Sequence, residues 1–141
     1  MNSARHLGAV SRSLLVVFAV VALVGVVAVV QSLMKPPTKP DAAVGQRVAE
    51  DFLAELHAGE PGAAWDSATA EFKSIEGRES FIRTAAKAPI LKEQLHFASM
   101  QEVQVGDQPR AEYIFQSPAS KMVRVLVGYE GGAWKVDRLT L

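Results

Sequence analysis

An unbroken apolar run near the N-terminus constrains this chain more than any other part of its sequence. Residues Leu14–Val30 are all apolar, and Gln31–Met34 extend the stretch to Lys35 without an ionisable side chain. A helix rises about 1.5 Å per residue, so Leu14–Met34 would be roughly 31 Å long, close to the thickness of a bilayer's hydrocarbon core. The run therefore predicts one membrane-spanning helix, and the lipid bilayer is the first partner that we expect.

Two other interpretations of the run compete with a membrane span. A buried core helix in so short a chain would rarely be apolar on every face. A cleavable secretory signal has some support, because Arg5 and Arg12 form a basic start and Val26–Ala28 offers small residues for cleavage. However, the run is longer than the roughly 7–15 apolar residues of a signal peptide and continues past that site. We therefore predict a signal anchor and keep cleavage as the alternative.

The flanking charges bear on the orientation of this anchor. Arg5 and Arg12 precede it, and Lys35 and Lys39 follow it, so the positive charge is nearly equal on the two sides of the anchor. A short tail with a positive start is the usual form of a signal anchor, and basic residues favour the cytoplasmic side. We expect residues 1–13 to form a cytoplasmic tail, residues 14–34 to span the membrane, and the C-terminal part to be extracytoplasmic, in a periplasm or outside the cell.

Composition narrows the function of the part beyond the anchor. From Lys35 onward the chain carries thirteen Lys and Arg against fifteen Asp and Glu. This balance argues against nucleic acid as a partner, which would need a clustered basic excess. The absence of cysteine excludes disulfides and thiolate metal sites. Proline occupies three of the six positions of 35–40, which predicts a stiff, extended spacer before a domain at 41–141.

The first half of that domain shows helical periodicity. Asp41 can cap a helix over Ala42–Ala58, whose apolar stripe would be Val44, Val48, Phe52 and Leu56, with Gly59 as its end. A second helix is expected over Pro61–Ala68 and a third from Ser74 or Glu76 to Lys87, stopped by Pro89. Thr69–Ile75 is interpreted as a turn region that carries Phe72 as an apolar plug.

The second half changes to the period of two that is typical of strands. Four strands are predicted: His96–Val105, Arg110–Gln116, Lys121–Glu130 and Ala133–Leu141, separated by turns rich in Gly and Pro. In the first, Phe97, Val103 and Val105 share one parity. Leu139 and Leu141 have the opposite parity to Trp134, which indicates a bulge or burial on two sides. The expected fold is α+β, with three helices packed on a curved four-stranded antiparallel sheet.

Several stretches of this domain resemble nuclear transport factor two-like (cystatin-like cone) domains. The resemblance rests on Ala49–Trp65, Thr69-x-x-Phe72, Gly77–Phe81 and Gly132–Val136. It covers roughly Asp41–Leu141, and its motifs are structural. It implies the cone-type fold and places the chain among small membrane-anchored proteins of unknown function. The family also includes isomerases, dehydratases and polyketide cyclases with pocket His and Asp residues, and anchored scaffolds of type IV secretion machinery.

The inward strand positions favour binding over catalysis. They are almost wholly apolar, and the expected pocket-lining residues are Trp65, Phe72, Tyr113, Phe115, Val125 and Trp134. His57 is expected at the C-terminal end of a helix, where it interacts favourably with the last backbone carbonyls and the helix dipole, and His96 is expected at a solvated strand edge. We find no catalytic, metal or cofactor motif. The prediction is therefore a non-enzymatic binding or assembly module, and the alternative is an isomerase-, dehydratase- or cyclase-like enzyme of the cone type.

The outward strand positions suggest a second contact surface. Arg110 and Glu112 are expected there with Ile114, Met122, Arg124 and Leu126, which together mix charge with sizeable apolar groups. We expect a homodimer or a membrane-protein partner to dock through this face. An anchor would favour such docking, because it holds copies in one plane at high effective concentration.

Overall fold

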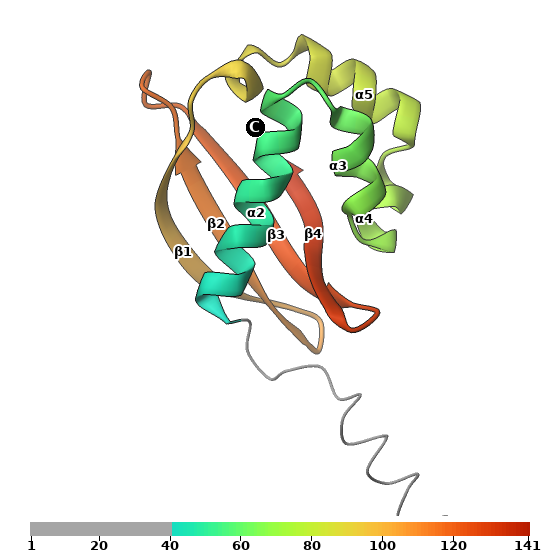
Figure 1. The fold of residues 1–141 in the computed structure, drawn as a ribbon. Coiled ribbons are helices and arrows are strands. Elements are labelled where there is room, and N and C mark those ends of the chain that lie inside the picture. The colour runs from blue at the N-terminus through green and yellow to red at the C-terminus, as the bar shows by residue number, and fades with distance from the viewer. Residues whose placement is uncertain (1–40) are drawn as a thin grey trace, which may run out of the picture. The chain divides into compact units, whose positions relative to one another are not determined.

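The computed structural model describes residues 41–141, so the predicted anchor at Leu14–Met34 and the spacer at 35–40 lie outside the described residues. None of the helices in residues 41–141 has the length and apolar character of a membrane span. This part of the chain has an α+β fold in which four α-helices pack with an open four-stranded antiparallel sheet (Figure 1). The predicted fold class is therefore confirmed at this level.

The helices follow one another before the strands begin. They are α2 (Ala42–His57), α3 (Pro61–Ser67), α4 (Ala70–Ile75) and α5 (Arg78–Lys87), followed by the 3₁₀ helix η1 (Pro89–Lys92). The expected cap and stop of the first helix are confirmed: the Asp41 carboxylate accepts the backbone N–H of Ala43 at 2.9 Å, and Gly59 has a φ of 81°.

The helix α4 corrects the prediction of a turn at Thr69–Ile75. The Thr69 hydroxyl accepts the Phe72 N–H at 3.1 Å and caps this six-residue helix. Its shortness explains the miss, because six residues hold less than two turns of apolar periodicity. The interpretation of Phe72 was right: it is 6% exposed, and its ring lies 5.8 Å from that of Phe52 and 5.2 Å from that of Phe81.

The sheet is a meander in the order β1-β2-β3-β4, made of His96–Val105, Gln108–Gln116, Met122–Glu130 and Ala133–Thr140. Two irregularities shape it. A register shift between Phe97 and Ser99 moves Val103 and Val105 to the face opposite Phe97. The expectation that these three side chains share one face of the sheet is therefore wrong. A second shift leaves Asp137 as an extra residue in β4, which confirms the bulge indicated by Leu139.

The helix α2 crosses the inner face of the sheet, and α3, α4 and α5 lie beside it on the β4 side (Figure 1). The core between these layers holds Tyr113, Val123, Val125 and Val127, which are all fully buried. One expectation for α2 fails: Val44 is 47% exposed, and Gly45 takes the inward position. A Cβ at Gly45 would overlap the Tyr113 hydroxyl, so glycine allows the ring to reach the helix backbone.

Candidate ligand-binding groove

A wide hollow in the described part of the chain lies between α2 and the segment from η1 to β1. Its volume is about 820 Å³, within the range of small-molecule sites. We call it the α2–β1 groove. It is lined by Glu50, Leu53, Ala54, His57, Ala58, Leu91, Lys92, Glu93, Gln94, Leu95, His96, Phe97 and Phe115.

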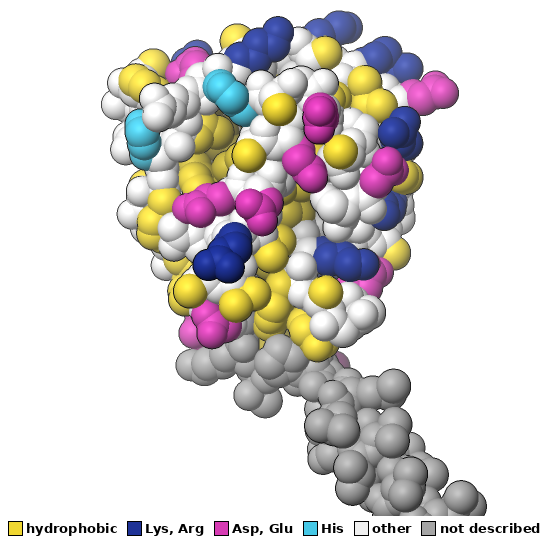
Figure 2. Space-filling view, viewed as in Figure 1, with side chains coloured by type: hydrophobic (Ala, Val, Ile, Leu, Met, Phe, Trp, Pro, Cys, Tyr) yellow, Lys and Arg dark blue, Asp and Glu magenta, His cyan; other side chains and the backbone are white. Residues whose placement is uncertain are grey.

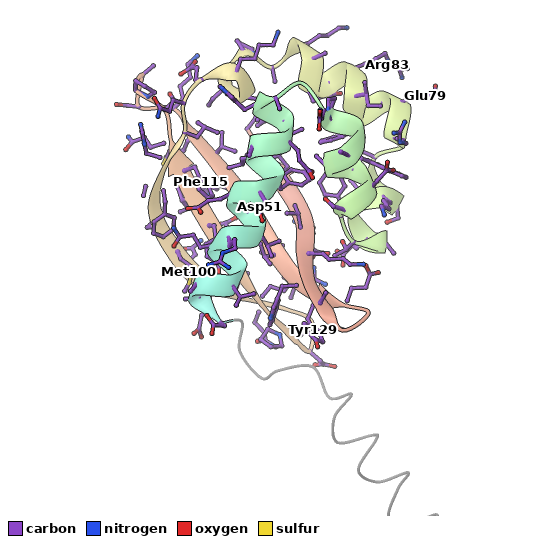
Figure 3. All side chains as sticks on the ribbon, in the orientation of Figure 1. Asp51, Glu79, Arg83, Met100, Phe115 and Tyr129 are labelled. Carbon is purple, nitrogen blue, oxygen red and sulfur yellow. The ribbon has the colours of Figure 1, made fainter. Side chains whose placement is uncertain are left out.

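The floor of the groove is apolar. Leu53 and Leu91 are buried core residues, and Phe115 comes from β2, where Figure 3 shows it beside α2. Phe97 is 41% exposed, and its ring lies 5.9 Å from that of Phe115, in an edge-to-face arrangement. Because a large aromatic side chain is left partly in water here, the groove offers apolar area that a ligand could cover.

Ionisable side chains surround this floor. Glu50 and His57 come from α2, while Lys92, Glu93 and His96 come from the opposite wall. Figure 2 shows the two described histidines on one face, above a hollow whose visible floor is hydrophobic. Glu50 accepts a hydrogen bond from the Gln46 side chain at 2.8 Å. Across residues 41–141, no group of three His, Cys, Asp or Glu side chains could hold a metal ion.

The side chains with displaced pKa values lie outside the groove. Burial raises the pKa of the Glu55 carboxyl, and the nearby charges of Glu60 and Asp51 raise it further. Burial, with a smaller effect from Asp41, raises the pKa of the Tyr113 phenol. Tyr113 is fully buried, and its hydroxyl donates to the Ala42 carbonyl at 3.1 Å, so this group has a structural role in holding α2 on the sheet. Neither residue lines the groove.

A buried ion pair lies at another position in the sheet. Arg110 is 7% exposed and pairs with Asp137, which is 3% exposed and accepts from the Thr69 hydroxyl at 2.8 Å. Arg110 also contacts Glu71 at 2.9 Å. A Cβ at Gly128 would lie 3.5 Å from Arg110 Nε, an ordinary van der Waals distance, so the guanidinium lies beside the β3 backbone at this point. This network ties α4 to the sheet, and it corrects the expectation that Arg110 lies on an open outer face.

The predicted pocket residues are not gathered in one site. Only Phe115 lines the α2–β1 groove. Phe72 lines a smaller apolar hollow of about 160 Å³ between α4, α5 and β4, which we call the α4–β4 pocket. Tyr113 and Val125 are fully buried in the core. Trp65 and Trp134 are partly buried and pack against the core from its periphery. The Trp65 indole also donates to the Glu76 carbonyl at 2.9 Å.

The predicted contact face of the sheet is less open than expected. The register places Ile114 opposite Arg124, and Met122 and Leu126 on the same face of β3. Met122 is 51% exposed, but Leu126 is only 6% exposed and therefore cannot contribute to an accessible apolar patch. That expectation for Leu126 was wrong.

We predicted no ligand-site residue on the η1–β1 side of the groove. Leu91, Leu95 and Phe97 belong to a segment whose apolar residues have neither helical nor strand periodicity, because a 3₁₀ turn and a bulge interrupt both. A signal was nonetheless available, since Lys92, Glu93 and His96 lie among the apolar residues Leu91, Leu95 and Phe97.

Comparison with known proteins adds no relative to this picture. No protein-family model matches the chain, and no curated protein matches it.

Proposed function

We propose that this chain is a single-pass membrane-anchored, extracytoplasmic binding module, and that the α2–β1 groove holds its ligand. The observation that carries the proposal is the groove itself, where an exposed edge of Phe97 stands over an apolar floor in a hollow of about 820 Å³. The apolar run at Leu14–Met34 supports the anchor. The helix α2 crossing a curved sheet supports the resemblance to nuclear transport factor two-like cone domains.

The lining favours a ligand with an apolar body and a polar end. Leu53, Leu91 and Phe115 form an apolar floor, while Lys92 and Glu93 place opposite charges at one wall. Apolar surface supplies most of the binding free energy in such sites, and a few polar groups fix orientation. A binding role needs nothing more from the site than this apolar floor and charged wall.

An enzyme of the isomerase, dehydratase or cyclase type is the second candidate. Its support is that His57, His96, Glu50 and Glu93 all line one hollow, and histidine and carboxylates are the usual proton-transfer groups. This candidate predicts that a small molecule taken up by the groove leaves it chemically altered.

The test places a photo-crosslinking amino acid at Ala54 of the full chain in cells. Ala54 is exposed and lines the groove, and the matched control is Ala63, an exposed helical alanine that does not line it. The proposal predicts a discrete adduct at Ala54 that is absent at Ala63 and is lost when Ala58→Trp fills the groove. Identical adduct patterns at the two positions would contradict it. A molecule recovered from the groove in isomerised, dehydrated or cyclised form would favour the enzyme.

A further inference from the structure

The α4–β4 pocket is a second hollow that the proposed function leaves unused. Its floor is formed by Phe72, Phe81 and Leu91, which are all at least nine-tenths buried, together with Leu139 of β4. Its volume of about 160 Å³ is close to that of an engineered apolar cavity that takes up one benzene molecule. The pocket is therefore the right size for a single large apolar side chain.

Apolar side chains also project at the mouth of this pocket. Ile75, the last residue of α4, is 63% exposed, and Leu141 is 51% exposed, although both line the pocket. Only five large hydrophobic residues are exposed in the described part of the chain, and two of them meet at this mouth. A projecting apolar group beside an open apolar pocket gives one patch both a knob and a hole.

Opposite charges stand at the same mouth. Arg138 is exposed, lines the pocket and makes no ion pair within residues 41–141. Glu76 also lines it, and one of its carboxylate oxygens accepts from the Ser80 and Thr84 hydroxyls at 3.2 and 3.0 Å. Its second oxygen has no such bond to a described residue, so it remains available as an acceptor.

From this arrangement we propose that a second copy of the chain docks on the α4–β4 pocket. In a two-fold interface the same patch meets itself, so each knob faces the hole of the other copy. Ile75 of each copy enters the pocket of the other, and Arg138 of each copy pairs with Glu76 of the other. The patch around the α4–β4 pocket carries a projecting apolar side chain, an apolar pocket and charges of both signs, so it is complementary to a second copy of itself. The inference does not depend on the α2–β1 groove.

The test measures association of the full chain in lipid vesicles by energy transfer. The chain contains no cysteine, so Ala119→Cys in the exposed turn between β2 and β3 gives a single labelling site. Energy transfer should rise with the number of chains per vesicle. Ile75→Asp should weaken association roughly tenfold or more, because it places a charge in the apolar centre of the interface. Met122→Asp, a charge placed at an equally prominent apolar residue of β3, should leave association unchanged.

The charge pair has its own control. Arg138→Glu should weaken association, whereas Arg138→Lys should retain most of it. Ile75 and Arg138 are both exposed, so these variants should unfold at the same temperature as the parent chain. Absence of concentration-dependent energy transfer would overturn the inference, and so would association that Met122→Asp abolishes and Ile75→Asp does not. If the chain does not enter vesicles, the same variants are compared in solution, so failure of the anchor is distinguished from failure of the interface.

Discussion

Arg110→Met should be one of the most destabilising single substitutions in the domain. It removes the cation that faces the Asp137 carboxylate, which is 3% exposed and keeps only the Thr69 hydroxyl as a neutral partner at 2.8 Å. Glu71, the other partner of Arg110, is 42% exposed and can return to water. The loss therefore falls mainly on one buried charge, and we expect a cost of about 3–5 kcal/mol in the free energy of unfolding.

The opposite deletion should cost less. In Asp137→Asn the guanidinium keeps Glu71 at 2.9 Å, and the Asn oxygen can still accept from Thr69, so about 3 kcal/mol or less is expected. The double variant Arg110→Met/Asp137→Asn carries no unpaired buried charge at this site. It should therefore be clearly more stable than the sum of the two single losses predicts.

Urea unfolding of the full chain, followed by tryptophan fluorescence, measures these differences, because Trp65 and Trp134 pack against the core. Arg124→Met is the matched control, since Arg124 is exposed on β3, and it should change stability by less than about 0.5 kcal/mol. A loss below about 1 kcal/mol for Arg110→Met would refute the buried pair, since a solvated pair contributes no more than that. Additive single losses would show that the two side chains do not interact.

Three further predictions concern packing, pH and orientation. Gly45→Ala should lower the free energy of unfolding by about 1–3 kcal/mol, because the new Cβ overlaps the Tyr113 hydroxyl. Gly62→Ala should be near neutral, because its Cβ overlaps only the flexible end of the exposed Arg78 side chain. Thermal unfolding of the two variants measures the difference. The raised pKa of Glu55 means that the folded state binds this proton more tightly than the unfolded state does. The free energy of unfolding should therefore fall as pH rises above about 4.5. Glu55→Gln should make this fall less steep, and an unchanged pH profile would contradict the prediction. A reporter fused after Leu141 should be active only outside the cytoplasm, and activity of a cytoplasmic reporter alone would reverse the orientation.

Long periodic segments made most of the fold predictable from sequence. The helix α2 and the strands β2 and β3 follow apolar periods that run for several turns or pairs. The turns after α2 and β3 carry Gly at positive φ, at Gly59 and Gly132. The short helix α4 was missed because its six residues are too few for a period to show. The bulge near Phe97 was missed because a one-residue shift reverses every later side chain without changing the composition.

The candidate sites were less predictable because they depend on tertiary contacts. Arg110 has the alternation of an outward residue, and its burial follows from Asp137 and Glu71, which come from other elements. The α2–β1 groove likewise joins residues from α2, η1 and β1 that have no common sequence period. The inward apolar set of the sheet could be predicted because alternation depends on one strand alone, whereas a groove depends on how separate elements pack.

One labelling measurement can show whether the chain is a membrane-anchored domain that holds a ligand outside the cytoplasm. Single cysteines replace Ala54 in the groove and Ala63 on α3, both exposed, in a chain that has no other cysteine. Intact cells are treated with a maleimide that does not cross the cytoplasmic membrane, and the rates are compared with those of purified protein from which small molecules have been removed. We predict that both positions are labelled in intact cells, and that Ala54→Cys reacts more slowly than Ala63→Cys in cells but not in the stripped protein. Labelling only after the cells are opened, or the same rate ratio in both preparations, would contradict the account.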